Sequence, residues 1–369
     1  MRVLTVNPGS SSVKLSVVDD GREVGQVTVG AAEARHPLAD LVARRQPIDA
    51  AGVRFVHGGP STDPVLLDDA ETARLTALTP LAPLHQPLSL ELAAVVTEIV
   101  TGPVYACFDT AFHALMPEPA ARYALPRNWV REHGLRRYGF HGLSCAYAVR
   151  RTAELLDREP AALHLVCCHI GSGVSVTAVR DGRGVDTSMG FTPLEGAVMA
   201  TRSGSVDPGL LLYLLRTGVT DAAGLNDVLE RGSGLAGMTG TGGDVRDVLA
   251  ARENGDPDAR AAIAVYLHRL RREIGAVVAS LDRLDALVFT GGVAEHQPAL
   301  LAELCGELGV FGVRVDPGRL AGDGDRLVSD AYAPARVLVV TAREDLEIAR
   351  QTTLALAART AGAGGPRDR

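Results

Sequence analysis

The chain has 369 residues, of which 46% are apolar and 22% are charged, and its formal net charge at pH 7 is -7. This composition is typical of a folded protein of one large or two medium domains, and it excludes a disordered or fibrous chain. The acidic balance argues against nucleic acid as a partner, and neither a long apolar run nor an N-terminal signal predicts a membrane or secreted protein, so we expect a cytoplasmic one.

Two apolar runs at the N-terminus predict a β-hairpin. Residues 2–7 and 13–18 have the pattern of strands and flank a turn of glycine and serines. The same pattern returns at residues 164–169 and 174–179, which flank a Gly-Ser-Gly turn. Two such hairpins, about 160 residues apart, favour a duplicated domain with a cleft between the halves, and two independent hairpins are the alternative.

Helical segments fall between the strands. We expect helices at residues 88–100, 144–156, 207–216, 256–284 and 344–359. Asp207-Pro208 is a favourable helix start, with aspartate as N-cap and proline in the first turn. The apolar runs 104–108 and 286–289 predict buried strands of a mostly parallel sheet. The fold class is therefore α/β, and the glycine-rich residues 361–369 predict a frayed tail.

The cysteines and the lysine are informative by their number. The five cysteines are odd in number and form no C-x-x-C pair, so we expect reduced thiols and neither a disulfide framework nor a zinc site. Lys14 is the only lysine among 37 basic residues, and it lies two residues after the serine-rich turn. A compact point charge there suits a phosphate group, and chance is the alternative.

Glycine turns offer places for a nucleotide, although the chain has no Walker A motif. Thr290-Gly291-Gly292 follows a buried strand, where glycine lets the backbone approach a phosphate. The sequence GTGG at 240–243 precedes Asp244 in a similar setting. Each turn alone also fits ordinary loop chemistry.

Charged residues lie beside glycine-flanked apolar segments. Asp109 follows the predicted strand 104–108, where catalytic carboxylates are commonly displayed, and its alternative role is a helix N-cap. Basic side chains occur in VRFVHGG (Arg54, His57), RRYGFHG (Arg136, Arg137, His141) and TRSGSVDP (Arg202). Arginine suits carboxylate and phosphate groups because its fork donates two parallel hydrogen bonds, and surface ion pairs are the alternative.

Longer motifs carry a more specific signal. They are NPGSSSVK at 7–14, APLHQP at 82–87, FDTAFH at 108–113, RRYGFHG at 136–142, DTSMGFTPLEG at 186–196 and TRSG at 201–204. In this order they resemble the motifs of the acetate kinases, which belong to the acetate and sugar kinase, heat-shock chaperone and actin superfamily. The resemblance implies duplicated ribonuclease-H-like (actin-like ATPase) domains with an interdomain catalytic cleft.

The resemblance also implies domain boundaries. Residues 1–150 would form the N-terminal domain, completed by a C-terminal helix at about 346–360, and residues 151–345 the nucleotide-binding domain. Residues 361–369 would be a flexible tail.

The implied reaction moves the γ-phosphoryl group of ATP to acetate and gives acetyl phosphate and ADP. Mg²⁺ would assist, with Mn²⁺ as an alternative, and the chain would form a homodimer. The nearest alternative is a propionate or butyrate kinase of the same family, because one methylene in an apolar pocket changes binding by only about 1–3 kcal/mol. A non-catalytic ATP-binding switch of the same superfamily is a second alternative.

The motifs carry residue roles with them. Asn7 and Glu344 would hold the metal, and Asp109, His141 and Arg202 would be catalytic. Acetate would lie against Arg54, Val56, Leu84, Phe140 and Pro193, with His85 as a supporting donor. The nucleotide would contact Ser10, Ser12, Lys14, His169, Gly171, Ser172, Gly173, Asp244, Val245, Arg246, Gly292, Val293, Ala294, Glu295 and His296.

Some positions depart from the family pattern. H-[LI]-G-N-G is HIGSG at 169–173 and G-I-G-E-N is GVAEH at 292–296, so a shorter Ser172 and the Cβ of Ala294 could alter nucleotide preference. G-T-S-H is GLSC at 142–145, and the segment between Asp20 and Arg54 is shorter than usual. E-E-L is EDL at 344–346, and spacing favours Glu344 over Asp345 as the metal ligand.

Overall fold

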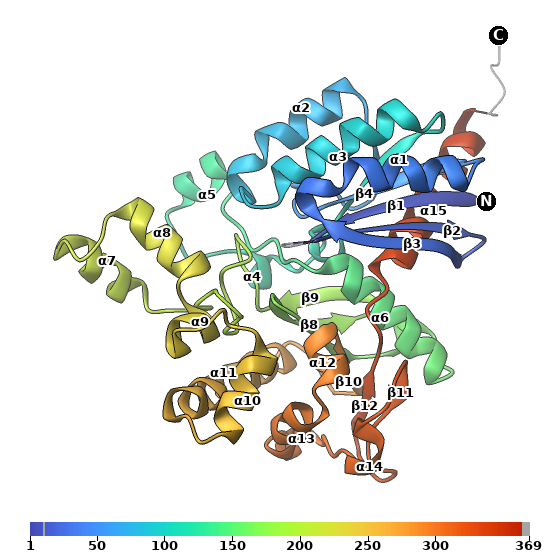
Figure 1. The fold of residues 1–369 in the computed structure, drawn as a ribbon. Helices are drawn as coiled ribbons and strands as arrows, with labels where there is room; N and C mark the ends of the chain where they lie inside the picture. Colours follow the sequence, from blue (N-terminus) through green and yellow to red (C-terminus); the bar gives the residue numbers. More distant parts are fainter. Residues whose placement is uncertain (10–11, 364–369) are drawn as a thin grey trace. The chain divides into compact units, whose positions relative to one another are not determined.

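A computed structural model of the chain describes residues 1–9 and 12–363 (Figure 1). The chain forms two compact units. Unit 1 contains Met1–Leu115, Phe140–Tyr147 and the residues from Arg343 on, and unit 2 contains Met116–Gly139 and Ala148–Ala342. Within the described residues, no helix has both the length and the apolar character needed to span a membrane.

Each unit is built on one six-stranded sheet with helices. Unit 1 contains β1 (Arg2–Pro8), β2 (Ser12–Asp19), β3 (Arg22–Gly30), β4 (Ala50–Phe55), β5 (Val65–Leu66), β6 (Val104–Phe108), α1 (Arg35–Arg44), α2 (Asp69–Ala77), α3 (Gln86–Ile99) and α15 (Glu344–Ala363). Helix α6 (Gly142–Leu155) begins in unit 1 and ends in unit 2.

Unit 2 repeats the pattern with more helices. Its strands are β7 (Leu165–Ile170), β8 (Val174–Arg180), β9 (Arg183–Thr187), β10 (Ala286–Thr290), β11 (Arg326–Leu327) and β12 (Arg336–Val339). Its helices are α4 (Glu118–Ala121), α5 (Arg127–His133), α7 (Pro208–Arg216), α8 (Ala222–Arg231), α9 (Gly234–Thr239), α10 (Val245–Glu253), α11 (Pro257–Val278), α12 (Gly292–His296), α13 (Pro298–Gly306) and α14 (Pro317–Leu320).

The two sheets have the same topology. The strand order is β3-β2-β1-β4-β6-β5 in unit 1 and β9-β8-β7-β10-β12-β11 in unit 2. In both, the three central strands are parallel, whereas the first three strands in sequence form an antiparallel meander. The predicted α/β class with duplicated halves is confirmed, and the two predicted hairpins are β1-β2 and β7-β8.

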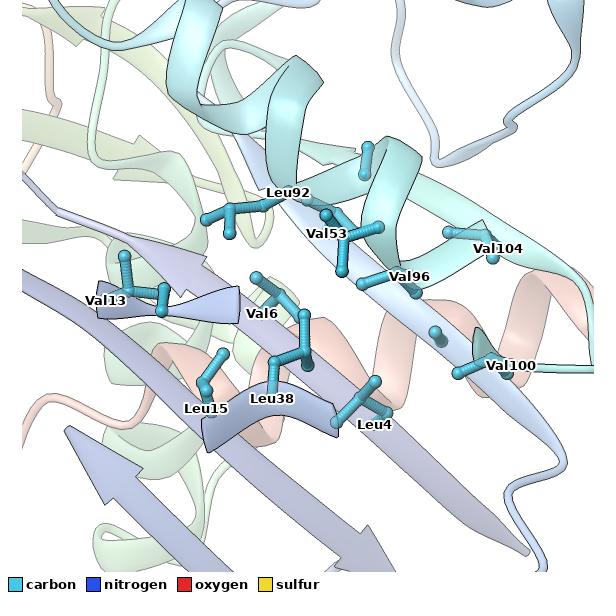
Figure 2. Packing of buried hydrophobic residues seen from close by; sticks show 14 of the residues in the cluster. Leu4, Val6, Val13, Leu15, Leu38, Val53, Leu92, Val96, Val100 and Val104 are labelled. Carbon is cyan, nitrogen blue, oxygen red and sulfur yellow. The ribbon is translucent and has the colours of Figure 1, made fainter. Parts of the chain in front are cut away.

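Apolar side chains on one face of the unit 1 sheet form a buried cluster with residues of the helices that cover it (Figure 2). Leu4 and Val6 of β1 share one apolar cluster with Leu38 of α1 and with Leu92 of α3. Val3, on the opposite face of the same strand, packs with residues of α15. The helix approaches closely because Gly52 of β4 has no side chain, and a Cβ there would overlap Ile348 and Thr352.

The structure corrects several expectations. The sheets are mixed rather than mostly parallel, because short hairpin turns force neighbouring strands to run antiparallel. Helix α11 ends at Val278 rather than at 284, since the chain turns there and Ser280 N–H bonds to Val277 O. Helix α15 continues to Ala363, so the helix includes residues 361–363 of the expected tail. Residues 364–369 lie outside the described chain.

Residues 116–139 belong to unit 2, whereas the expected boundary at 150 groups them with the N-terminal half. Backbone bonds explain this placement. Arg137 N–H donates to Ala121 O at 2.7 Å, and Tyr138 N–H donates to Gly190 O at 3.0 Å. This segment therefore joins the loop that follows β9.

Candidate active site

The carboxyl ends of β1, β4 and β6 place three polar side chains at one edge of the unit 1 sheet. Asn7 lies near the end of β1, Arg54 near the end of β4, and Asp109 directly after β6. The three strands are parallel neighbours, so their carboxyl ends meet at the same edge. In open α/β sheets this is the edge where ligands bind.

Arg54 and Asp109 form a buried ion pair. Arg54 Nη2 donates to Asp109 Oδ2 at 2.7 Å, and Arg54 Nε donates to Oδ1 at 3.1 Å. The side chains are 11% and 1% exposed. The alternative role of Asp109 as a helix N-cap is not observed, because the short helix that follows has Thr110 at its N-cap.

The opposite side of the guanidinium contacts the end of β1. Arg54 Nη1 donates to Asn7 Oδ1 at 3.1 Å and to Pro8 O at 3.2 Å, and lies 3.6 Å from Glu344 Oε2. A guanidinium has five N–H donors, and these bonds within the described residues leave one Nη2 N–H for a ligand. The two-pronged face of Arg54 therefore grips Asp109 rather than an acceptor carboxylate.

Glu344 joins this cluster from the first turn of α15. Asn7 Nδ2 donates to Glu344 Oε2 at 2.7 Å. Glu344 therefore lies in the cluster formed by Asn7, Arg54 and Asp109, whereas Asp345 points to other partners.

The charges of the cluster act on one another. Burial would lower the pKa of Arg54, but the charges of Asp109 and Glu344 raise it above its ordinary value. Burial raises the pKa of Asp109, and the adjacent guanidinium opposes that rise. Two bonds between guanidinium and carboxylate favour the ionised pair, so Arg54 keeps its positive charge beside the carboxylates of Asp109 and Glu344.

His141 reaches the same carboxylate through its backbone. Its N–H bonds to the Asp109 carboxylate, and its φ of 56° lies in the left-handed region, which is uncommon for a residue other than glycine. Gly142, the next residue, starts α6 and donates its N–H to Asp109 O at 3.1 Å. A Cβ at Gly142 would overlap that oxygen, so only glycine fits this close approach.

Lys14 of β2 pairs with the buried Asp345. The distance from Lys14 Nζ to Asp345 Oδ1 is 3.1 Å, and Arg343 Nη2 donates to Oδ2 of the same carboxylate at 2.9 Å. Burial would raise the pKa of Asp345, but Arg343 and Lys14 lower it below its ordinary value. Ser12 starts β2 and accepts a bond from Gly9 N–H through its carbonyl, and Ser10 lies outside the described residues.

The predicted acetate wall is divided between the units. In unit 1, Val56 and Phe140 are buried, and Leu84 is 43% exposed. The His57 ring lies edge-on to the ring of Phe140, at 5.9 Å between centroids. His85 precedes α3 and is half-buried.

Unit 2 holds Arg202 and Pro193 together. Arg202 Nε lies 3.0 Å from Glu230 Oε2, and Arg202 Nη1 donates to Pro193 O at 3.3 Å. The Arg202 side chain is 13% exposed. Among the described residues these contacts leave Nη2 available to an anion.

The glycine turns of unit 2 follow β7 and β10. After β7, Gly171 N–H donates to Gly173 O at 3.0 Å and Ser172 O accepts from Ala200 N–H at 3.2 Å, with His169 near the end of the strand. After β10, Gly291 has a φ of 91° and lies against Ile170, where a Cβ would come within 2.8 Å of the Ile170 carbonyl oxygen. The strands β7 and β10 are parallel, so both turns lie at one edge.

Helix α12 begins right after that glycine. Gly292, Val293 and His296 are at least partly exposed, whereas Ala294 is fully buried. Glu295 Oε1 accepts from Ala342 N–H at 2.9 Å. Glu295 therefore has a structural partner in this unit.

Asp244 caps helix α10. Its Oδ1 accepts from Arg246 N–H at 2.9 Å, and the Arg246 side chain returns to the same carboxylate. The side-chain hydrogen bond from Arg246 lowers the pKa of Asp244. Val245 is buried and Arg246 is 75% exposed, so of the three only Asp244 and Arg246 offer polar groups to a ligand.

The unit 1 donors fit a phosphate-bound magnesium ion. No group of three or more His, Cys, Asp and Glu side chains in the described part of the chain gathers as a metal site. Asn7 Oδ1 and the Glu344 carboxylate are hard oxygen donors on adjacent residues of the cluster. Mg²⁺ usually keeps several waters and takes one or two protein oxygens plus substrate phosphates, so this pair suffices.

Sequence reasoning missed several partners in these sites. Glu230, which pairs with Arg202, gives no sequence signal, because it lies in an ordinary amphipathic helix. Glu195 is part of the motif at 186–196, yet the motif alone does not show that it pairs with Arg137 and Tyr123.

Comparisons with known proteins agree with one another. The sequence profile described as "Acetokinase family" matches residues 36–350. The curated acetate kinase of a Synechococcus species is 46% identical over 312 residues, which are 84% of this chain and 77% of that protein.

Solved structures show the same similarity. The acetate kinase of Porphyromonas gingivalis has a TM-score of 0.87 and 32% identity, with 96% of this chain and 99% of that chain covered. A propionate kinase of Francisella tularensis has a TM-score of 0.88 and 30% identity over the same shares.

Proposed function

Because the chain belongs to the acetokinase family, we propose that it transfers the γ-phosphoryl group of ATP to the carboxylate of acetate, giving acetyl phosphate and ADP. The observation that carries this proposal is the buried Arg54–Asp109 pair, with Asn7 and Glu344 beside it, at the carboxyl edge of the unit 1 sheet. The pair holds the Arg54 guanidinium in a fixed orientation, and carboxylates beside it suit a divalent cation that would bring an anionic phosphoryl group to an anionic acceptor.

The residues of the cluster have distinct roles in this proposal. Phosphoryl transfer depends on positioning and on charge stabilisation rather than on covalent chemistry of the protein. Arg54 offers one N–H and its charge to the anionic substrates, and Asp109 fixes the orientation of its guanidinium. His141 and Arg202 would stabilise the equatorial oxygens, and Lys14 would leave Asp345 for the nucleotide phosphates.

Mg²⁺, or Mn²⁺ in its place, would be held by Asn7 and Glu344 and would neutralise charge on the β- and γ-phosphate oxygens of ATP. The nucleotide itself would lie against the unit 2 glycine turns, from His169 to Gly173 and from Gly292 to His296.

A propionate or butyrate kinase is the second candidate for the acceptor. The similarity to a propionate kinase structure favours it, and the apolar pocket residues discriminate weakly between acids that differ by one methylene. A non-catalytic ATP-binding switch is disfavoured, because such a protein has no use for a pocket that binds an acceptor carboxylate.

We also propose a cytoplasmic homodimer. Helix α7 supports the dimer: its nine residues are mostly apolar, and none is buried. Leu210, Leu212 and Tyr213 are 46%, 66% and 52% exposed. A helix that is apolar all round normally packs against another surface, and a second copy related by a twofold axis is the commonest partner.

The proposed reaction is tested by trapping acyl phosphate with hydroxylamine. Purified protein receives Mg-ATP and acetate, propionate or butyrate in parallel. We expect the largest kcat/KM with acetate, and a larger value with a longer acid would replace the substrate while keeping the mechanism. If no acyl phosphate is trapped with any of the three acids, the proposal is contradicted.

Variants tie the signal to the cluster. Arg54→Ala should lower kcat/KM by about 100-fold or more, because it removes both a donor and the charge that Asp109 holds in place. Arg35→Ala is the matched control, since that arginine is 73% exposed and pairs with the exposed Glu98. Circular dichroism of both variants separates lost activity from lost folding.

A further inference from the structure

Unit 2 contains a polar network that the proposed roles do not use. Glu195 accepts from Arg137 Nη2 at 2.7 Å through Oε1, and from Tyr123 Oη at 2.6 Å through Oε2. The Arg137 guanidinium carbon also lies 5.6 Å from the centroid of the Tyr123 ring. Glu195 is therefore held by two residues that lie about 60–70 positions earlier in the chain. Bringing such distant residues together costs more conformational entropy than a contact between neighbours in sequence.

The network grips the backbone of the loop that follows β9. Tyr123 Oη accepts from Phe191 N–H at 2.9 Å, and Arg137 Nη1 donates to Ser188 O at 3.1 Å. Gly190 lies directly beneath it, and a Cβ there would overlap both Glu195 Oε2 and Tyr123 Oη. The side chains of Tyr123, Arg137 and Glu195 therefore contact the backbone of the loop directly and fix its position.

Residues 188–207 contain no helix or strand, so side chains must hold them in place. The loop carries Pro193 and Arg202, which are joined by the bond from Arg202 Nη1 to Pro193 O. Gly196 N–H donates to Ser205 Oγ at 3.0 Å and so joins the middle of the loop to its C-terminal part. The positions of Pro193 and Arg202 therefore depend on the position of Glu195.

The protonation states suit a permanent clamp. Burial and the bond to Glu195 raise the pKa of Tyr123, so the phenol keeps the proton that it donates. Burial alone would lower the pKa of Arg137, but Glu195 raises it. Both donors of the network, Tyr123 and Arg137, therefore keep their protons near neutral pH.

We propose that Glu195, clamped by Tyr123 and Arg137, is a positioning residue that sets where Pro193 and Arg202 stand for the acceptor and the transferring phosphoryl group. The proposal rests on the proposed function, since it assigns the clamp to the same reaction. Its consequence is twofold: a loosened clamp lowers kcat, and it weakens discrimination between acetate and propionate, because Pro193 belongs to the proposed acetate wall.

The test compares Tyr123→Phe and Glu195→Gln with the control Tyr138→Phe. The first removes the hydroxyl shared by Glu195 and Phe191 N–H, and the second removes the charge that holds Arg137 while keeping one acceptor oxygen. The control deletes a hydroxyl that donates to the exposed Gly134 O, and it keeps the ring that lies 6.0 Å from Phe191.

Kinetics and hydrogen exchange are measured on the same proteins. We expect Tyr123→Phe to lower kcat for acetate by about 10- to 100-fold with a smaller change in KM, because misplacement of a group that acts in the transition state affects the rate. The ratio of kcat/KM for acetate to that for propionate should fall. Amides of residues 190–196 should exchange faster, while those of α11 keep their protection.

Glu195→Gln should show the same pattern with a smaller effect, and Tyr138→Phe should match the parent protein in every measurement. Faster exchange of the loop with unchanged kinetics would overturn the proposal, as would unchanged exchange in Tyr123→Phe. An inactive parent protein would contradict the proposed function, and the exchange comparison would then decide the clamp by itself.

Discussion

At the scale of single residues, the most informative side chain is Arg54. Its fork is occupied by Asp109 and its far side by Asn7 and Pro8, so the guanidinium is fixed before any substrate arrives. Fixed donors need no reorganisation during the reaction, which is how a preorganised site lowers a barrier. The residue therefore acts as a fixed charge more than as a flexible clamp.

Two buried histidines make stability depend on pH. Burial lowers the pKa of His57, with Arg74 adding to the effect, and burial lowers that of His113; both fall from 6.5 to about 4. Between pH 6.5 and about 4, these histidines are protonated in the unfolded chain and neutral in the folded chain. The free energy of unfolding therefore decreases as the pH falls. We expect a loss of up to about 3 kcal/mol for each ring, measured by urea unfolding at pH 7, 5.5 and 4.

The control for this prediction separates the buried rings from carboxylates. His113→Asn should flatten the loss between pH 6.5 and 4, because one titrating ring is gone. His36→Gln, at a side chain that is 88% exposed, should leave the curve unchanged. Parallel curves for the parent protein and His113→Asn would contradict the assignment.

At the scale of elements, the site depends on how strand ends meet helix starts. β6 ends at Phe108, directly before Asp109, and α6 begins at Gly142, whose N–H bonds to the Asp109 carbonyl. The junction has no space for a side chain at Gly142, and the adjacent His141 adopts a left-handed conformation that costs energy. The geometry of the motif RRYGFHG is therefore a packing requirement as well as a chemical one.

Gly142→Ala tests this junction. The added Cβ would overlap Asp109 O and push the first turn of α6 away, so we expect a destabilisation of about 1–3 kcal/mol and a lower kcat. Urea unfolding and the hydroxamate assay measure the two effects. Gly306→Ala, at the end of α13 where no atom lies within 4 Å of a new Cβ, should change neither.

Local sequence patterns predicted where the strands lie better than they predicted how the strands pair with one another. The hairpins and the buried strands β6 and β10 were readable because strand periodicity is a property of neighbouring residues. The parallel or antiparallel direction of the other strands depends on connections across the chain, and the predicted parallel sheet was accordingly wrong in part.

The site shows the same limit. Motifs named Asn7, Arg54, Asp109 and Glu344, and the structure brings these four together. The partner of Arg202 could not be predicted, because Glu230 is one acidic residue among many on helix surfaces. Whether each named residue performs its assigned role stays a prediction.

At the scale of the whole molecule, the exposed apolar helix α7 predicts the oligomeric state. Leu212→Glu places a charge on the most exposed leucine of that helix, and we expect it to convert the dimer to a monomer. Light scattering over a range of concentrations measures the mass in solution. Tyr332→Glu, at a side chain that is 86% exposed in a loop away from α7 in sequence, should keep the mass of the parent protein.

A monomeric parent protein would contradict the dimer outright. Equal masses for the parent protein and Leu212→Glu, both dimeric, would move the contact away from α7 while keeping the dimer.

The division of the chain also bears on its synthesis. Every residue of unit 2 precedes Arg343, whereas unit 1 needs α15, the last element of the described chain, to cover one face of its sheet. On the ribosome, domains tend to fold as units once their residues have emerged. Unit 2 can therefore fold while translation continues, and the sheet that carries Arg54 and Asp109 must wait. Glu344 and its helix are synthesised after every residue of unit 2, so a chain terminated before Arg343 would contain all of unit 2 and would lack the helix that covers one face of the unit 1 sheet.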